Sequence, residues 1–176
     1  MTSLSEKNDD PYKSSEFKEN LEILRRIFFF SGIPIEKLKV FAYISRRETF
    51  RDGENIFIQG EDDGQGIFII SGKTTLIYDG PEGEEEIKTL EEGEFLGGIS
   101  LLGEMRRHFT LQASGNVVCL IIKRDQFVSA LQQFPDLLPK IVKSMAERIN
   151  DWEGRFVDYR KESCTFCRHK LGVSIL

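Results

Sequence analysis

The residues best suited to bind a ligand lie in one glycine-rich stretch and in the arginine that follows it. The stretch is Gly97, Gly98, Ile99 and Ser100, and Arg107 comes seven residues after its end. A short helix beginning near Gly97 would leave its first N–H groups free for an anion, and glycine lets the backbone approach a ligand closely. An arginine adds charge-assisted hydrogen bonds to a phosphate. These residues therefore predict a site for a small phosphate-like anion.

The elements that must position this stretch read as short strands joined by glycine turns. Between Arg46 and Lys123 the apolar runs recur about every ten residues, a spacing typical of an antiparallel sandwich or barrel. The last run, Val117–Lys123, is apolar enough to be a strand covered on both faces. The expected strands are Thr49–Phe50, Asn55–Gln59, Gly66–Ser71, Lys73–Asp79, Glu86–Leu90, Phe109–Ser114 and Val117–Lys123.

Helices are expected before the strands. Residues 1–15 are polar and are predicted to form a disordered arm. Apolar residues at helical spacing then predict a helix from about Glu16 to Phe28. Pro34 is expected to open a second helix, whose inward face is Leu38, Phe41 and Ala42.

A long helix is expected after the strands. A short helix over Arg124–Phe134 comes first, and Pro135 starts or restarts the helical pattern, which continues to about Tyr159. Spacings of four and three residues alternate along this segment, as in the heptad seam of a coiled coil, and predict a homodimer through the helix Leu138–Tyr159. The alternative is a long helix packed on its own barrel. The seam is Leu138, Val142, Met145, Ile149, Trp152, Phe156 and Tyr159.

Two stretches of this sequence resemble the cyclic nucleotide-binding domain of catabolite-activator-type regulators, protein kinase regulatory subunits and cyclic-nucleotide-gated channels. The resemblance covers about Leu21 to Asn150 and implies an α+β, mainly β fold, an antiparallel β-roll (double-stranded jelly roll) with N-terminal helices and a long C-terminal helix. The pattern of expected helices and strands places the domain at residues 16–160 and a tail at 161–176. The stretches are Gly53–Glu61 followed by Phe68–Gly72, and Gly93–Leu102 followed by Arg107 and Thr110.

The resemblance also implies a ligand, cyclic AMP or cyclic GMP, or a related small anion. It assigns the phosphate-binding position to Arg107 and the threonine that follows it in the family to Thr110. The long helix is where the family places residues that cap the base. The candidate phosphate cassette is Gly97, Gly98, Ile99, Ser100, Arg107, His108, Phe109 and Thr110, and the candidate cap is Trp152, Phe156 and Tyr159.

One position departs from the family pattern. Nine residues before the arginine the family has a glutamate that accepts a hydrogen bond from the ribose 2′-hydroxyl, and this sequence has Gly98. A hydrogen bond to a charged group contributes roughly 1.5–3 kcal/mol, about ten- to a hundredfold in affinity. His108 and Phe109 are also bulkier than the family's residues. Two interpretations follow: Arg107 binds a cyclic phosphate, or Arg107 is a solvated arginine at a strand end and the pocket is degenerate.

Composition narrows the function. The 176 residues carry a net charge of −5, which opposes nucleic-acid binding by the chain itself. We expect a cytoplasmic protein with no membrane segment, since the densest apolar run, Ile27–Phe30, is far too short to span a bilayer. A metal enzyme on a jelly roll would need clustered histidines, and His108 stands alone on the roll. The expected function is a non-catalytic sensor with a separate protein partner, or a dimerisation module without nucleotide binding.

The tail carries one further motif. Cys164, Cys167 and His169 are the right residue types for three ligands of a zinc site. A single Cys-x-x-Cys pair is weak support for a metal, and exposed thiols are the alternative interpretation.

Overall fold

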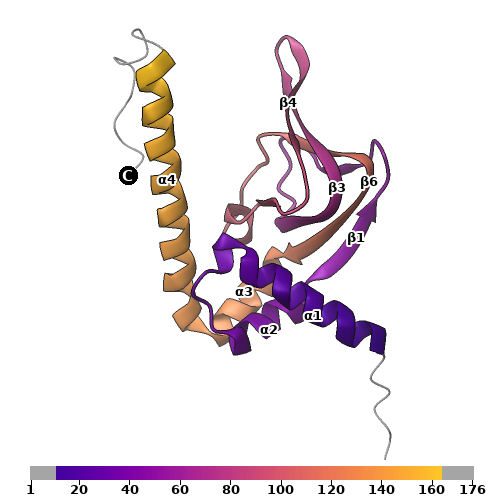
Figure 1. Cartoon of the computed structure of the whole chain (residues 1–176), viewed down its shortest axis with the longest axis vertical. Coiled ribbons are helices and arrows are strands. Elements are labelled where there is room, and N and C mark those ends of the chain that lie inside the picture. Colours follow the sequence, from indigo (N-terminus) through magenta and orange to yellow (C-terminus); the bar gives the residue numbers. More distant parts are fainter. Residues whose placement is uncertain (1–10, 164–176) are drawn as a thin grey trace, which may run out of the picture.

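The computed structural model describes residues 11–163 of the chain and the side chains of residues 15–154. Six strands form one antiparallel sheet with helices at one end, and the last helix, α4 (Leu138–Ser163), extends away from the sheet (Figure 1). This confirms the predicted α+β, mainly β class with a long C-terminal helix.

Two long strands form the centre of the sheet. β6 (Thr110–Lys123) pairs with β3 (Gln65–Gly80) over most of their lengths, and Ile69 lies opposite Cys119. β6 also pairs with β1 and β2, and β3 also pairs with β4 and β5. The remaining strands are β1 (Arg46–Phe50), β2 (Asn55–Phe57), β4 (Gly83–Leu90) and β5 (Phe95–Leu96).

Two predicted breaks between strands are irregularities within single bent strands. The expected turn at Ser71-Gly72 lies inside β3, where the register with β6 shifts, and Gly115 lies inside β6. Gly72 has φ +95°, and a Cβ atom there would lie 2.5 Å from the Asn116 carbonyl oxygen. Glycine at this position therefore permits a bulge and a close strand approach, not a chain reversal.

The alternation along β6 divides the apolar core in two. Leu111, Val117 and Cys119 are fully buried inside the roll, whereas Leu120 and Ile122 pack with the helices. Both faces of the strand are covered, which confirms the interpretation of its apolar sequence.

The N-terminal helices close one side of this core. α1 (Pro11–Arg26) begins five residues earlier than predicted, with proline at its first position, where the missing N–H costs no helical hydrogen bond. A 3₁₀ turn, η1 (Phe28–Phe30), and α2 (Ile35–Ile44) follow. Leu38, Phe41 and Ala42 are buried, as predicted.

The C-terminal helices start on the same core. α3 (Arg124–Gln133) leads through the 3₁₀ turn η3 (Pro135–Leu137) into α4. Ile141 and Ser144 of α4 are buried, and the Ser144 hydroxyl donates to the Phe29 carbonyl oxygen over 3.1 Å. Beyond these turns α4 leaves the core (Figure 1). Within residues 11–163, no helix is long and apolar enough to cross a membrane.

Candidate ligand-binding site

A cavity of about 600 Å³ lies where the sheet, the N-terminal helices and α4 meet. This volume is within the range of small-molecule sites. The predicted cassette residues Gly97 to Ser100 and Arg107 to Phe109 line it, together with Met145 and Ile149 of α4. A ligand in this cavity would therefore contact both the roll and the long helix.

The glycine stretch forms a tight turn beside Arg107. Gly97 has φ +78°, and a Cβ atom there would lie 2.2 Å from the Gln65 carbonyl oxygen and 2.7 Å from Nη1 of Arg107. No other residue fits, because the conformation and the space both require glycine. One 3₁₀ turn, η2 (Ile99–Leu101), follows, and the Leu101 N–H donates to the Gly97 carbonyl oxygen over 3.2 Å.

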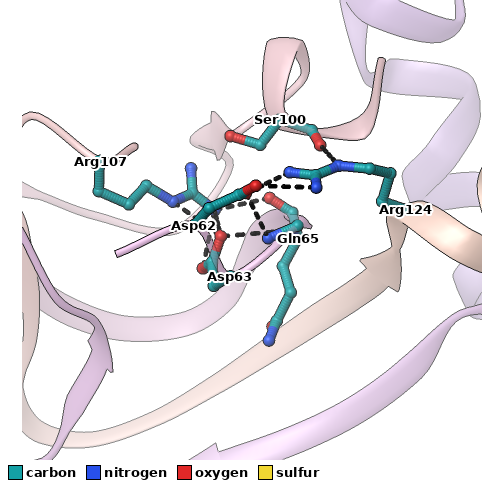
Figure 2. Close-up of polar contacts among 7 residues, drawn as sticks. Asp62, Asp63, Gln65, Ser100, Arg107 and Arg124 are labelled. Carbon is teal, nitrogen blue, oxygen red and sulfur yellow. Dashed lines mark hydrogen bonds and ion pairs between the residues drawn. The ribbon is translucent and has the colours of Figure 1, made fainter. Parts of the chain in front are cut away.

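Arg107 is buried and paired, with a side chain that is 7% exposed. Its Nε and Nη2 donate to the Asp63 carboxylate over 3.0 and 2.9 Å, and Nη2 also donates to the Gln65 carbonyl oxygen over 2.6 Å (Figure 2). The guanidinium lies 4.2 Å from the centre of the Phe57 ring, a cation–π contact. The interpretation of Arg107 as a solvated arginine is therefore wrong. Nη1, beside Gly97, is the guanidinium nitrogen that these bonds leave for a ligand.

A second arginine–aspartate pair lies next to the first. Arg124, at the start of α3, donates through Nη1 to Asp62 over 2.9 Å and through Nε to the Ser100 carbonyl oxygen over 2.6 Å. The two arginines reach the neighbouring carboxylates from opposite sides (Figure 2). The hydrogen bond from Arg124 holds the pKa of the Asp62 carboxyl below its usual value. The loop between β2 and β3 thus links the cavity wall to α3.

Aromatic side chains from outside the cassette occupy the space beside Gly98, where the family has its glutamate. A Cβ atom on Gly98 would lie 2.9 Å from Cδ2 of Phe29 and 3.3 Å from Cε1 of Phe95. An aromatic wall therefore occupies the space that a ribose acceptor would need.

The rim of the cavity is strongly basic. Arg26 from α1, Arg106 from the loop before β6, and Arg148 from α4 line it and are exposed. Among the described residues that line the cavity, Glu94 is the acidic one. This local charge opposes the net acidity of the chain and favours an anionic ligand.

The other predicted residues divide into four groups. His108 and Phe109 line the cavity and are exposed. Thr110 instead braces the roll, because its hydroxyl accepts a hydrogen bond from the Gln59 N–H over 3.0 Å. Trp152 is half-exposed and is not among the residues that line the cavity. The side chains of Phe156 and Tyr159, and the motif Cys164, Cys167 and His169, lie outside the described residues.

The sequence interpretation missed the residues that complete the site. Asp62 and Asp63 read as polar loop residues, and Arg26 and Arg148 lie far from the cassette in the sequence. A pair of acids within a glycine-bounded turn is a weak sign of arginine clamps. No other sequence signal marks these four residues.

Comparisons with known proteins agree with this geometry. A family model described as the cyclic nucleotide-binding domain matches residues 47–134, half of the chain. Human cGMP-dependent protein kinase 2 is 28% identical over 136 residues, which cover 75% of this chain and 18% of that protein. The mouse protein is 28% identical over 124 residues, covering 68% and 16%. The chain thus spans less than a fifth of these relatives.

Solved structures share the fold. A cyclic nucleotide-binding-like protein from Brucella abortus is 25% identical with a TM-score of 0.60, covering 65% of this chain and 98% of that one. The N-terminal domain of a transcriptional regulator from Streptomyces coelicolor is 21% identical with a TM-score of 0.68, covering 76% and 94%. The regulatory domain of Toxoplasma gondii PKA, solved with cAMP, is 22% identical with a TM-score of 0.62, covering 76% and 52%.

Proposed function

The chain belongs to the cyclic nucleotide-binding domain family, and we propose that it is a non-catalytic regulatory module that binds a small organic anion. Cyclic AMP and cyclic GMP are the first candidates, because the family relatives include cGMP-dependent protein kinases and a PKA regulatory domain solved with cAMP. The ligand occupies the cavity, and its presence is relayed through α4.

The observation that carries this proposal is the position of the cavity between the roll and α4. Arg106 and His108 of the roll lie on its rim, and Arg148 and Ile149 of α4 also line it. A ligand shifts a conformational equilibrium only when its contacts differ between the two states. A ligand here touches both elements, so its free energy of binding depends on the position of α4.

Calorimetric titration with cyclic AMP and with cyclic GMP tests the binding step. We expect dissociation constants in the micromolar range, and about fivefold weaker binding by Arg148→Gln, which removes one rim charge. Lys143→Gln is the matched control, because Lys143 is an exposed cation of the same helix outside the cavity. The absence of binding by either nucleotide would remove both from the candidates. Equal weakening by the two variants would contradict binding in this cavity.

The relay step has a reporter in the chain. Trp152 is the single tryptophan of the sequence and lies on α4, half-exposed. We expect its emission maximum to shift as ligand saturates the cavity, because Trp152 follows the movement of α4 without lining the site. Saturation by calorimetry with an unchanged emission spectrum would contradict the relay.

A second function is favoured by the exposed apolar seam of α4. Leu138, Val142, Ile149 and Trp152 are 41–52% exposed in the single chain. In this alternative the pocket is degenerate, and the chain acts as a homodimeric interaction module without nucleotide binding. Dimerisation is compatible with both functions, so the ligand titration separates them.

A further inference from the structure

The aromatic wall at Gly98 leaves no space for a side chain unless Phe29 shifts. Gly98 has φ −54° and ψ −39°, ordinary right-handed values that any residue adopts, so space and not conformation requires glycine. The Phe29 ring that fills this space is 6% exposed. Its centre lies 5.1 Å from that of Phe30, 5.6 Å from Phe95 and 5.7 Å from Phe127. A displaced Phe29 would disturb this whole aromatic cluster.

Apolar surface continues from this wall along the cavity. Phe57, Leu76, Leu96 and Ile149 line it, and none of these side chains offers a hydrogen-bond acceptor. A ribose hydroxyl placed beside Phe29 would lose its water without gaining a carboxylate, which costs roughly tenfold in affinity. An apolar group in the same place would gain from burial.

The free positive charge of the cavity lies on the exposed side chains of its rim. Arg26, Arg106 and Arg148 come from three separate elements, and within residues 15–154 no ion pair or hydrogen bond occupies their guanidinium groups. Arg107, by contrast, is already paired with Asp63. The rim arginines therefore offer more unpaired positive charge to an acidic group of the ligand than Arg107 does.

We propose that the ligand of this cavity is an amphipathic organic anion, with a phosphate or carboxylate at the arginine rim and an apolar body against Phe29. The ribose 2′-hydroxyl is not read. The inference rests on the proposed function, since it names the class of anion that the same cavity binds.

Calorimetry of the full chain with three probes tests this class: cyclic AMP, 2′-deoxy-cyclic AMP, and octyl phosphate below its micellar concentration. We expect the deoxy nucleotide to bind at least as tightly as cyclic AMP, and octyl phosphate to bind about tenfold more tightly than either, through buried apolar area. Octanol, which lacks the charge, is expected to bind at least tenfold more weakly than octyl phosphate.

A pair of neighbouring arginines supplies the site control. Arg26→Gln removes a rim charge and is expected to weaken octyl phosphate several-fold. Arg25→Gln makes the same change one residue earlier, where the arginine is paired with Glu22 and does not line the cavity, and is expected to leave binding unchanged.

The outcomes separate this inference from the proposed function. Cyclic AMP binding tenfold more tightly than its deoxy analogue would show that the hydroxyl is read, which overturns the inference and supports a nucleotide sensor. Failure of octyl phosphate to bind overturns the inference in the same way, provided that a nucleotide binds. If no probe binds, the inference and the ligand-binding function both fail.

Discussion

At the scale of single residues, the departure from the family at Gly98 is a packed feature of the fold and not an empty place. A carboxylate at this position would need the space that Phe29 occupies 2.9 Å from the Cβ position. Restoring the family residue therefore should not restore the family's ribose contact. Substitutions of Gly98 test this expectation.

Gly98→Ala is expected to lower the free energy of unfolding by about 1–3 kcal/mol, because an added methyl overpacks the aromatic cluster. Gly103→Ala is the control: nothing lies within 4 Å of its Cβ position, and it should be close to neutral. Urea denaturation measures the free energy of unfolding of both variants.

Gly98→Glu should lose at least as much stability as Gly98→Ala without gaining affinity for cyclic AMP. A stable Gly98→Glu protein that binds cyclic AMP tenfold more tightly would contradict this account.

At the scale of elements, the loop between β2 and β3 connects the cavity to α3 through two ion pairs. Asp63 holds Arg107 and Asp62 holds Arg124, which also binds the carbonyl of Ser100 in η2. Each carboxylate takes most of its hydrogen bonds from an arginine distant in sequence. The two carboxylates also accept hydrogen bonds from the Gly64 and Gln65 N–H groups, so the loop fixes its own turn as well as the contact between cassette and helix.

The Asp62 pair should give a defined pH dependence of stability. Because the hydrogen bond from Arg124 lowers the pKa of Asp62 from its ordinary 3.8, the folded state favours the carboxylate. The stabilisation is present above that ordinary value and is lost as the pH falls through the lower folded pKa. We expect Asp62→Asn to lower Tm by a few degrees at neutral pH, with the difference from the unmodified chain shrinking as the pH falls below about 4.

Asp79→Asn is the control for this series, because Asp79 is exposed and its side chain has no arginine partner among the described contacts. Its Tm should follow that of the unmodified chain at every pH. A Tm difference for Asp62→Asn that stays constant into acid would contradict the ion-pair explanation.

The elements also show how far the sequence can predict this fold. Helical periodicity and proline placement predicted α2, and the apolar run Val117–Lys123 predicted the doubly covered half of β6, because those signals are local. The turn predicted at Ser71-Gly72 and the break predicted between Ser114 and Val117 are irregularities within β3 and β6, because a bulge and a turn require the same backbone freedom. The partner of Arg107 was not predictable, since the Asp63 contact spans 44 residues and depends on how the loop folds.

At the scale of the whole molecule, α4 contributes both to the apolar core and to the wall of the cavity. Its buried residues Ile141 and Ser144 anchor it to the core, and Arg148 and Ile149 line the cavity. Of the described seam residues, Met145 packs against the core, whereas Leu138, Val142, Ile149 and Trp152 are 41–52% exposed in the single chain. The first turns of the helix therefore pack on the chain's own core, as the alternative holds, and pairing through the exposed seam residues stays a prediction.

Exposed apolar residues in a heptad pattern favour pairing with a second copy of the helix, since each buried apolar side chain contributes about 1.5–3 kcal/mol. We expect the chain to sediment as a dimer at micromolar concentration. Val142→Glu should shift it to a monomer, because Val142 is 52% exposed, lies in the seam and does not line the cavity.

Asn150→Glu adds the same side chain to an exposed position outside the seam and should leave the dimer intact. A monomer for the unmodified chain at about 100 μM, a concentration well above the dissociation constant expected of a stable dimer, would contradict the pairing. Because Val142 is outside the cavity, a monomeric Val142→Glu protein also permits a direct measurement of whether ligand binding depends on the second copy.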